Sequence, residues 1–131
     1  MAMSRSENMR RIRSKDTSPE RTVRSIVHLL GFRFRLHRED LPGKPDLVFP
    51  SRKKLIFVNG CFWHGHGCPG VARKPKTNTE YWVKKIRDNK KRDVRNHRKL
   101  RILGWQILVI WECETEEDPE RLRGRLLSFL R

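Results

Sequence analysis

Cysteine and histidine residues gather in one short stretch of the sequence, residues 61–68. Cys61, His66 and Cys68 lie within this stretch, and Cys113 follows a hydrophobic run much later in the chain. Zinc prefers four Cys or His ligands in a tetrahedron, and a closed set of four leaves no open position for a substrate. The spacing therefore predicts a structural zinc site that uses every cysteine of the chain. The alternative is that the cysteines are unrelated, with Cys113 a small apolar residue at the end of a strand.

A second metal site is indicated by Asp46, which begins a short hydrophobic strand after a Pro-Gly-Lys-Pro turn. Nucleases that use Mg²⁺ often place one carboxylate on one strand and further ligands on the next, because this hard cation binds oxygen. The commonest pattern has an acidic residue, a spacer and a lysine on that second strand. Here Phe57, Val58 and Asn59 stand there instead. The main-chain carbonyl of Val58 remains a candidate ligand.

His64 lies inside the same Cys-rich loop, and the zinc set is complete without it. An imidazole changes charge near neutral pH, so His64 could act as the general base for an attacking water. Equally, His64 could replace His66 as a zinc ligand, or be a surface residue. The spacing alone leaves these interpretations open.

Aromatic and basic residues surround this loop. Phe62 and Trp63 are adjacent, and both cannot easily point inward, so we expect at least one to contact something apolar outside, such as stacked bases. Trp82 has the same two interpretations, with core packing as the default. Ten Lys or Arg residues lie between Lys84 and Arg101, which favours contacts with phosphates over a merely solvated helix face.

The composition agrees with a folded protein that binds nucleic acid. Lys and Arg number 31 against 15 Asp and Glu, which gives a net charge of +16, and 36% of residues are hydrophobic. A ribosomal or merely basic soluble protein is the alternative. No apolar run could cross a membrane, residues 1–14 lack the apolar segment of a secretion signal, and three cysteines suit a reducing compartment. We therefore expect a cytoplasmic protein.

The elements that must position these residues form one α/β domain over residues 1–131, with a mixed central β-sheet flanked by helices. Residues 1–16 are predicted to be a basic arm that contacts DNA. The pattern predicts a first helix capped by Ser18 and closed by Gly31. Strands are expected over residues 32–37, 46–49, 54–58 and 106–111, and helices over 79–104 and from 118 onward. The side chains expected to face inward are Trp82, Val83, Ile86, Val94 and Leu100 in the long helix and Leu122, Leu126, Leu127 and Leu130 in the last one.

Three motifs together carry a resemblance to a known family: residues 41–46 (LPGKPD), 60–68 (GCFWHGHGC) and 111–114 (WECE). With residues 5–9, 16–20 and 77–86, they make the chain resemble the very short patch repair (Vsr) DNA mismatch endonucleases over nearly its whole length. The resemblance implies a fold like that of type II restriction endonucleases and a structural Zn²⁺. It also implies nicking of one strand of duplex DNA next to a T:G mismatch, with Mg²⁺ as the catalytic ion.

The resemblance implies roles for individual residues as well. Asp46 and the carbonyl of Val58 match ligands of Mg²⁺, His64 matches the general base, and Glu20 matches a helix carboxylate near the metal waters. The zinc ligands are matched by Cys61, His66, Cys68 and Cys113, and the aromatic residues that wedge into DNA by Phe62, Trp63 and Trp82. Residues near the mismatched bases and their backbone are matched by Met9, Lys85 and Asn89.

Asn59 departs from the family pattern, which usually has a histidine there. An amide can neither accept a proton nor become cationic, so we expect weakened or absent cleavage. Two alternatives remain open: an inactive module that binds distorted duplex, and a nicking or restriction enzyme with another target. We expect a monomer, because one nick needs one active site, with other mismatch-repair proteins as candidate partners.

Overall fold

The computed structural model describes residues 17–36, 38–61 and 79–131. The elements in chain order are α2 (Ser18–Leu29), β1 (Arg35–Leu36), β2 (Leu47–Phe49), the 3₁₀ turn η1 (Pro50–Arg52), β3 (Lys54–Asn59), α3 (Thr79–Ile102), β4 (Gln106–Trp111), α4 (Glu112–Glu117) and α5 (Pro119–Leu130). The four strands form one sheet in the order β1-β2-β3-β4. The pairs β1–β2 and β2–β3 are antiparallel and β3–β4 is parallel. The predicted mixed sheet with flanking helices is confirmed, and the predicted arm at 1–16 lies outside the described residues.

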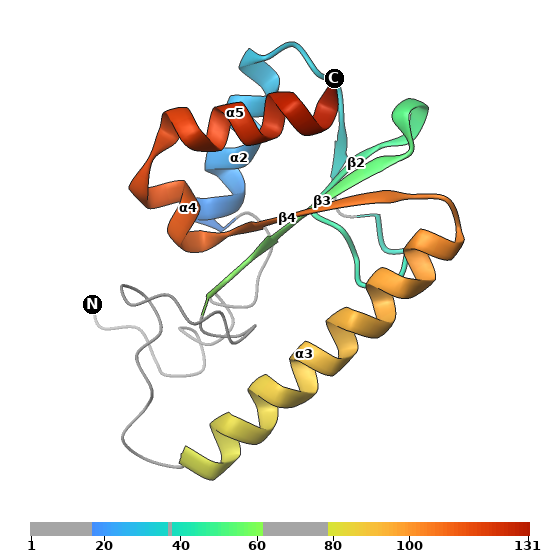
Figure 1. The fold of residues 1–131 in the computed structure, drawn as a ribbon, viewed down its shortest axis with the longest axis vertical. Helices are drawn as coiled ribbons and strands as arrows, with labels where there is room; N and C mark the ends of the chain where they lie inside the picture. The colour runs from blue at the N-terminus through green and yellow to red at the C-terminus, as the bar shows by residue number, and fades with distance from the viewer. Residues whose placement is uncertain (1–16, 37, 62–78) are drawn as a thin grey trace, which may run out of the picture.

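Two separate cores cover the two faces of the sheet, because side chains alternate along each strand. On β2 and β3, Leu47 and Ile56 face the core formed with α2 and α5, whereas Val48 and Leu55 face the core formed with the end of α3. Figure 1 shows α2 and α5 on one side of the sheet and α3 on the other. The hydrophobic strands predicted around residues 46–49, 54–58 and 106–111 are confirmed within one residue at each end.

The cap of α2 is one residue earlier than predicted. The side chain of Thr17, not that of Ser18, accepts a hydrogen bond from the main-chain N–H of Glu20 at 3.4 Å. Gly31 ends the helix as predicted, with φ of +88° and its N–H donated to the carbonyl of His28. With Thr17 as the cap, Glu20 falls in the first helical turn, and its side chain is turned toward the protein interior.

Two other expectations about burial are wrong. Of the described residues in the strand expected over residues 32–37, only Arg35 and Leu36 form a strand. Leu36 is exposed, although Phe32 and Phe34 do pack against the core. In α3, Val83 and Val94 are exposed, at 49% and 69%. A helix of 24 residues is about 36 Å long, whereas a six-residue strand such as β4 is roughly 20 Å, so much of α3 has no sheet to pack against.

The chain end is helical in two pieces. The sequence did not predict α4, which begins where β4 ends and is capped by Glu114, whose carboxylate accepts the N–H of Trp111 at 2.8 Å. In α5 the predicted side chains of Leu122, Leu126 and Leu130 are buried, and Leu127 is half-buried. Within the residues that the structure describes, no helix is long and apolar enough to span a membrane.

Candidate functional site

Asp46 lies directly before β2 and is fixed by two bonds to β3. Its main-chain N–H donates at 3.1 Å to the carbonyl of Ile56, the residue that pairs with Leu47 in the register of β2 and β3. Its carboxylate oxygen Oδ2 accepts the main-chain N–H of Val58 at 2.6 Å. The carboxylate that the sequence singled out is therefore held against β3 beside Val58, the other candidate ligand.

The turn before Asp46 is tightly packed. Gly43 and Lys44 both have positive φ, at +78° and +50°. A Cβ atom on Gly43 would lie 3.2 Å from Asn96 of α3 and 3.2 Å from the ring of Phe57. Glycine is thus required here both by the backbone conformation and by the close approach of α3. This turn fixes the point at which the chain enters β2 and so the position of Asp46.

Glu20 brings a second carboxyl group to Asp46. The residue is only 4% exposed, and its side chain is hydrogen-bonded to that of Asp46. Arg24, one helical turn further along α2, places its guanidinium 3.7 Å from Glu20 Oε2. The sequence pointed to Glu20 only through the family resemblance and missed Arg24, whose spacing from Glu20 was its one signal.

The pair of carboxyl groups has an electrostatic consequence. Burial, followed by the hydrogen bond with Glu20, raises the pKa of Asp46 from 3.8 to about 8, while the Val58 N–H and the charge of Arg24 act in the opposite direction. At neutral pH the ionised form of Asp46 is therefore unfavourable unless a proton or a cation compensates its charge. Perturbed carboxyl groups of this kind are common at functional sites.

The donor set of this site suits a hard divalent cation. Mg²⁺ is usually bound by one or two carboxylates and keeps several waters. The described residues contain no group of three or more His, Cys, Asp or Glu side chains that could hold a metal ion. Within the described part of the chain, a cation beside Glu20 and Asp46 would take its other ligands from main-chain and water oxygens, which agrees with the expected role of the Val58 carbonyl.

Asn59, the residue that departs from the family pattern, is the last residue of β3 and is 7% exposed. It follows Val58 and is paired in register with Trp111 of β4. The structure thus places Asn59 next to the residue whose N–H holds Asp46. Its expected influence on cleavage stays a prediction.

Cys61 and Cys113 are brought together by the register of the parallel strands. Asn59 pairs with Trp111, and the same offset carried two residues further puts Cys61 opposite Cys113. Both cysteines are buried, and the N–H of Cys113 donates to Cys61 Sγ at 3.4 Å. Half of the predicted zinc set is therefore adjacent, whereas His66 and Cys68 lie outside the described residues.

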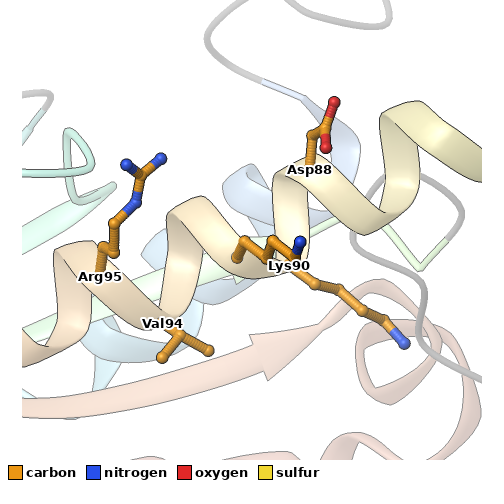
Figure 2. A pocket seen from close by; sticks show the side chains of 5 residues that line it. Asp88, Lys90, Val94 and Arg95 are labelled. Carbon is orange, nitrogen blue, oxygen red and sulfur yellow. The ribbon is translucent and has the colours of Figure 1, made fainter.

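The long basic helix carries three more predicted site residues. Trp82, Lys85 and Asn89 are half-buried, and the Trp82 ring packs edge-on against Tyr81 at 5.2 Å. Further along, an open hollow on α3 is lined by Asp88, Lys90, Lys91, Val94 and Arg95 (Figure 2). The remaining predicted contact residues, Met9, Phe62, Trp63 and the candidate base His64, lie outside the described residues.

Comparison with known proteins gives consistent matches. A family model described as DNA mismatch endonuclease Vsr matches residues 2–70. The type II nicking enzyme V.XorIIP of Xanthomonas oryzae pv. oryzae is 51% identical over 122 residues, which cover 93% of this chain and 88% of that protein. The type II nicking enzyme V.NmeAIP of Neisseria meningitidis is 43% identical, with 97% and 89% covered. The DNA mismatch endonuclease Vsr of Escherichia coli is 42% identical, with 92% and 72% covered.

Proposed function

Because this chain belongs to the family of Vsr DNA mismatch endonucleases, we propose that it nicks one strand of duplex DNA next to a T:G mismatch with the help of Mg²⁺. That it is a DNA endonuclease follows from the family. Its relatives named as nicking enzymes support the single-strand cut, and the relative named as a mismatch endonuclease supports the preference for mismatches. The choice of T:G rests on the resemblance of the motifs.

The observation that carries the proposal is the Glu20–Asp46 carboxyl pair held against β3. A bound Mg²⁺ would neutralise developing charge on the attacking and leaving oxygens of a phosphodiester. The Val58 N–H holds one oxygen of Asp46, and the hydrogen bond with Glu20 holds the two carboxyl groups together. Water attacks phosphorus while the bond to the 3′ oxygen breaks, and His64 takes the proton of that water.

A structural zinc site made of Cys61, His66, Cys68 and Cys113 is part of the proposal. Its support is the adjacent, buried pair of cysteines at matched positions after β3 and β4. Four Cys and His ligands close the coordination sphere, so such a zinc would join the loop after β3 to the start of α4 without taking part in cleavage. The proposed fold is that of the type II restriction endonucleases, and the four-stranded mixed sheet agrees with it.

DNA binding is proposed to combine two contributions. The basic side chains of α3 would contact phosphates, and the exposed Val94 within them shows that this helix face is not covered by the described part of the chain. Phe62, Trp63 and Trp82 would provide the preference for a mismatch, because a wobble pair is easier to unstack than a matched pair.

Asn59 favours a second candidate function, binding of mismatched duplex without efficient cleavage. It is buried beside Val58, where a histidine could share in proton transfer or stabilise charge and an amide cannot. Loss of one such group commonly slows a reaction by ~10²–10⁴-fold. We therefore propose tight mismatch binding with slow nicking.

The test is a nicking assay on matched and T:G duplexes in Mg²⁺. We expect slow nicking of the T:G duplex alone, faster nicking by Asn59→His, and none when Asp46→Ala is added to that variant. Equal cutting of matched duplex would indicate another target. Tight mismatch binding without nicking, even in Asn59→His, would indicate a binding module. Fast nicking by the native chain, unchanged in Asn59→His, would show that Asn59 has no influence here.

A further inference from the structure

We propose that Arg24 is a positioning residue of the endonuclease site, whose fixed positive charge lets the Glu20–Asp46 pair accept a DNA phosphate once Mg²⁺ is bound. The inference rests on the proposed function for its metal and its substrate. It concerns a residue that neither the motifs nor the pattern of strands indicated.

The geometry of Arg24 differs from that of a surface ion pair. Arg24 and Glu20 are spaced i, i+4 on α2, their side chains are 17% and 5% exposed, and Nη2 lies 3.7 Å from Oε2. By contrast, Arg38 and Asp40 form a pair whose side chains are 32% and 61% exposed. Solvent and salt screen the exposed pair strongly and the buried one weakly. Solvent therefore screens the charge of Arg24 at the carboxyl pair less than it screens the charge of Arg38 at Asp40.

Arg24 also supplies what β3 lacks. In the common magnesium-nuclease pattern the second strand provides a lysine beside the carboxylates, and here that stretch reads Phe57, Val58 and Asn59. Arg24 places a cation at the same carboxyl pair from α2 instead. Its charge reaches Asp46 as well as Glu20, since it favours the ionised form of Asp46.

The charges of the site show why this cation matters. Two carboxylates balance one Mg²⁺, so a phosphodiester group entering the site would add one uncompensated negative charge. Arg24 compensates that charge. Uncompensated charge in a poorly solvated site is costly, so removal of Arg24 should weaken acceptance of the phosphate. Before DNA arrives, however, Arg24 competes with Mg²⁺ for Glu20, so its removal should strengthen metal binding.

These two effects have opposite signs, which separates the proposed role from a merely structural one. A residue that only supported the fold, or only held Glu20 in place, would weaken both metal binding and cleavage when it was replaced. Arg24→Gln removes the charge and keeps a polar side chain, and Arg24→Lys keeps the charge. Arg21→Gln is the matched control, because Arg21 is an exposed arginine on the same helix.

The experiment measures Mg²⁺ affinity without DNA, from the rise in Tm with Mg²⁺ concentration, and single-turnover nicking of a T:G duplex at saturating Mg²⁺. All variants are made in the Asn59→His background. We expect Arg24→Gln to bind Mg²⁺ roughly tenfold more tightly, the size of effect that one nearby charge commonly has. We expect its nicking to be roughly 10–100-fold slower, from the loss of one electrostatic contact to the reacting group. Arg24→Lys should restore most of the rate, and Arg21→Gln should change neither quantity.

The outcomes distinguish this proposal from the proposed function. The reference protein is the Asn59→His variant without a further change. If it nicks the T:G duplex, the proposed function stands. Unchanged or weaker Mg²⁺ binding in Arg24→Gln, or an unchanged nicking rate, then overturns the role of Arg24. If the reference protein binds Mg²⁺ but does not nick, the proposed function fails. The role of Arg24 at a phosphate-accepting site then fails with it, whatever the metal affinity of the variant. A reference protein that binds no Mg²⁺ overturns both.

Discussion

Replacing Asp46 with asparagine should stabilise the Mg²⁺-free protein at neutral pH. Burial and the contact with Glu20 raise the pKa of Asp46 from 3.8 to about 8, so the native fold opposes ionisation that the unfolded chain allows. At about 1.4 kcal/mol for each pKa unit, the penalty at pH 7 is at most roughly 4 kcal/mol. The asparagine side chain would carry no charge and could still accept the N–H of Val58. Because its hydrogen bonds are weaker than those of the native pair, we expect a net gain of about 2 kcal/mol, or roughly 5–10 °C in Tm.

The pH dependence gives the prediction its sign. The raised pKa of Asp46 means that the native protein binds a proton which the unfolded chain has already released. The contribution of Asp46 to stability is therefore full below pH 3.8, falls as the pH rises toward 8, and levels off above that value. Asp46→Asn has no such group, so its advantage should be small at pH 5 and should widen up to pH 8.

The assay is thermal unfolding between pH 5 and 9 in Mg²⁺-free buffer, without a chelator that would also remove zinc. Asp46→Ala is the first control: it removes the same charge but leaves the Val58 N–H without its acceptor, at a cost of ~1–3 kcal/mol. Asp40→Asn is the second, because Asp40 is an exposed residue paired with Arg38 and should give no gain. If Asp46→Asn melts no higher than the native protein at pH 8, or if its advantage is the same at pH 5, the electrostatic reasoning is wrong.

Three further predictions test other parts of the molecule. Gly43→Ala should lower the free energy of unfolding by roughly 1–3 kcal/mol, measured by heat or urea, because it places a Cβ at positive φ and 3.2 Å from Asn96 and Phe57. Gly124→Ala is the control, because this glycine lies in a helix with open space around it, and it should raise the free energy of unfolding by about 0.5–1 kcal/mol. Elemental analysis should find about one zinc per chain. Cys113→Ser should lose both zinc and thermal stability, whereas His64→Ala should keep both. Zinc loss in His64→Ala would mean that this histidine, not His66, is the ligand. Lys91→Gln, on the basic side of α3, should weaken binding to matched and mismatched duplex alike. The slope of log affinity against log salt concentration should fall in magnitude by roughly one. A selective loss of mismatch binding would contradict a phosphate contact.

The strands were predictable because each signal is local. The runs that became β3 and β4 are hydrophobic, short and bounded by turns, and they read as buried strands from composition alone. The inward side of α3 was predicted less well. Helical periodicity identifies which residues share a face, but it does not show whether anything packs against that face, and Val83 and Val94 lie where nothing in the described residues covers them.

The candidate site was predictable only in part, since it is assembled over long sequence separations. Asp46 could be found from its turn and strand, but nothing in the local pattern links it to Glu20 on helix α2. Arg24 was harder still, because its spacing from Glu20 is a weak signal in a chain with 31 Lys and Arg residues. What singles out Arg24 is its burial beside a carboxyl pair, which is a property of the fold.

The strand β3 links the two proposed metal centres. The N–H of Val58 holds the carboxylate of Asp46, and three residues later Cys61 lies opposite Cys113 through the register with β4. A slip of one residue in that register would turn every side chain of β3 to the other face of the sheet and would separate the two cysteines. Zinc bound by both cysteines would therefore oppose such a slip and keep β3, the strand that carries Val58, in register with β4. On this reasoning a zinc ion that never touched the substrate would still hold the strand whose Val58 N–H binds Asp46 in its place in the sheet.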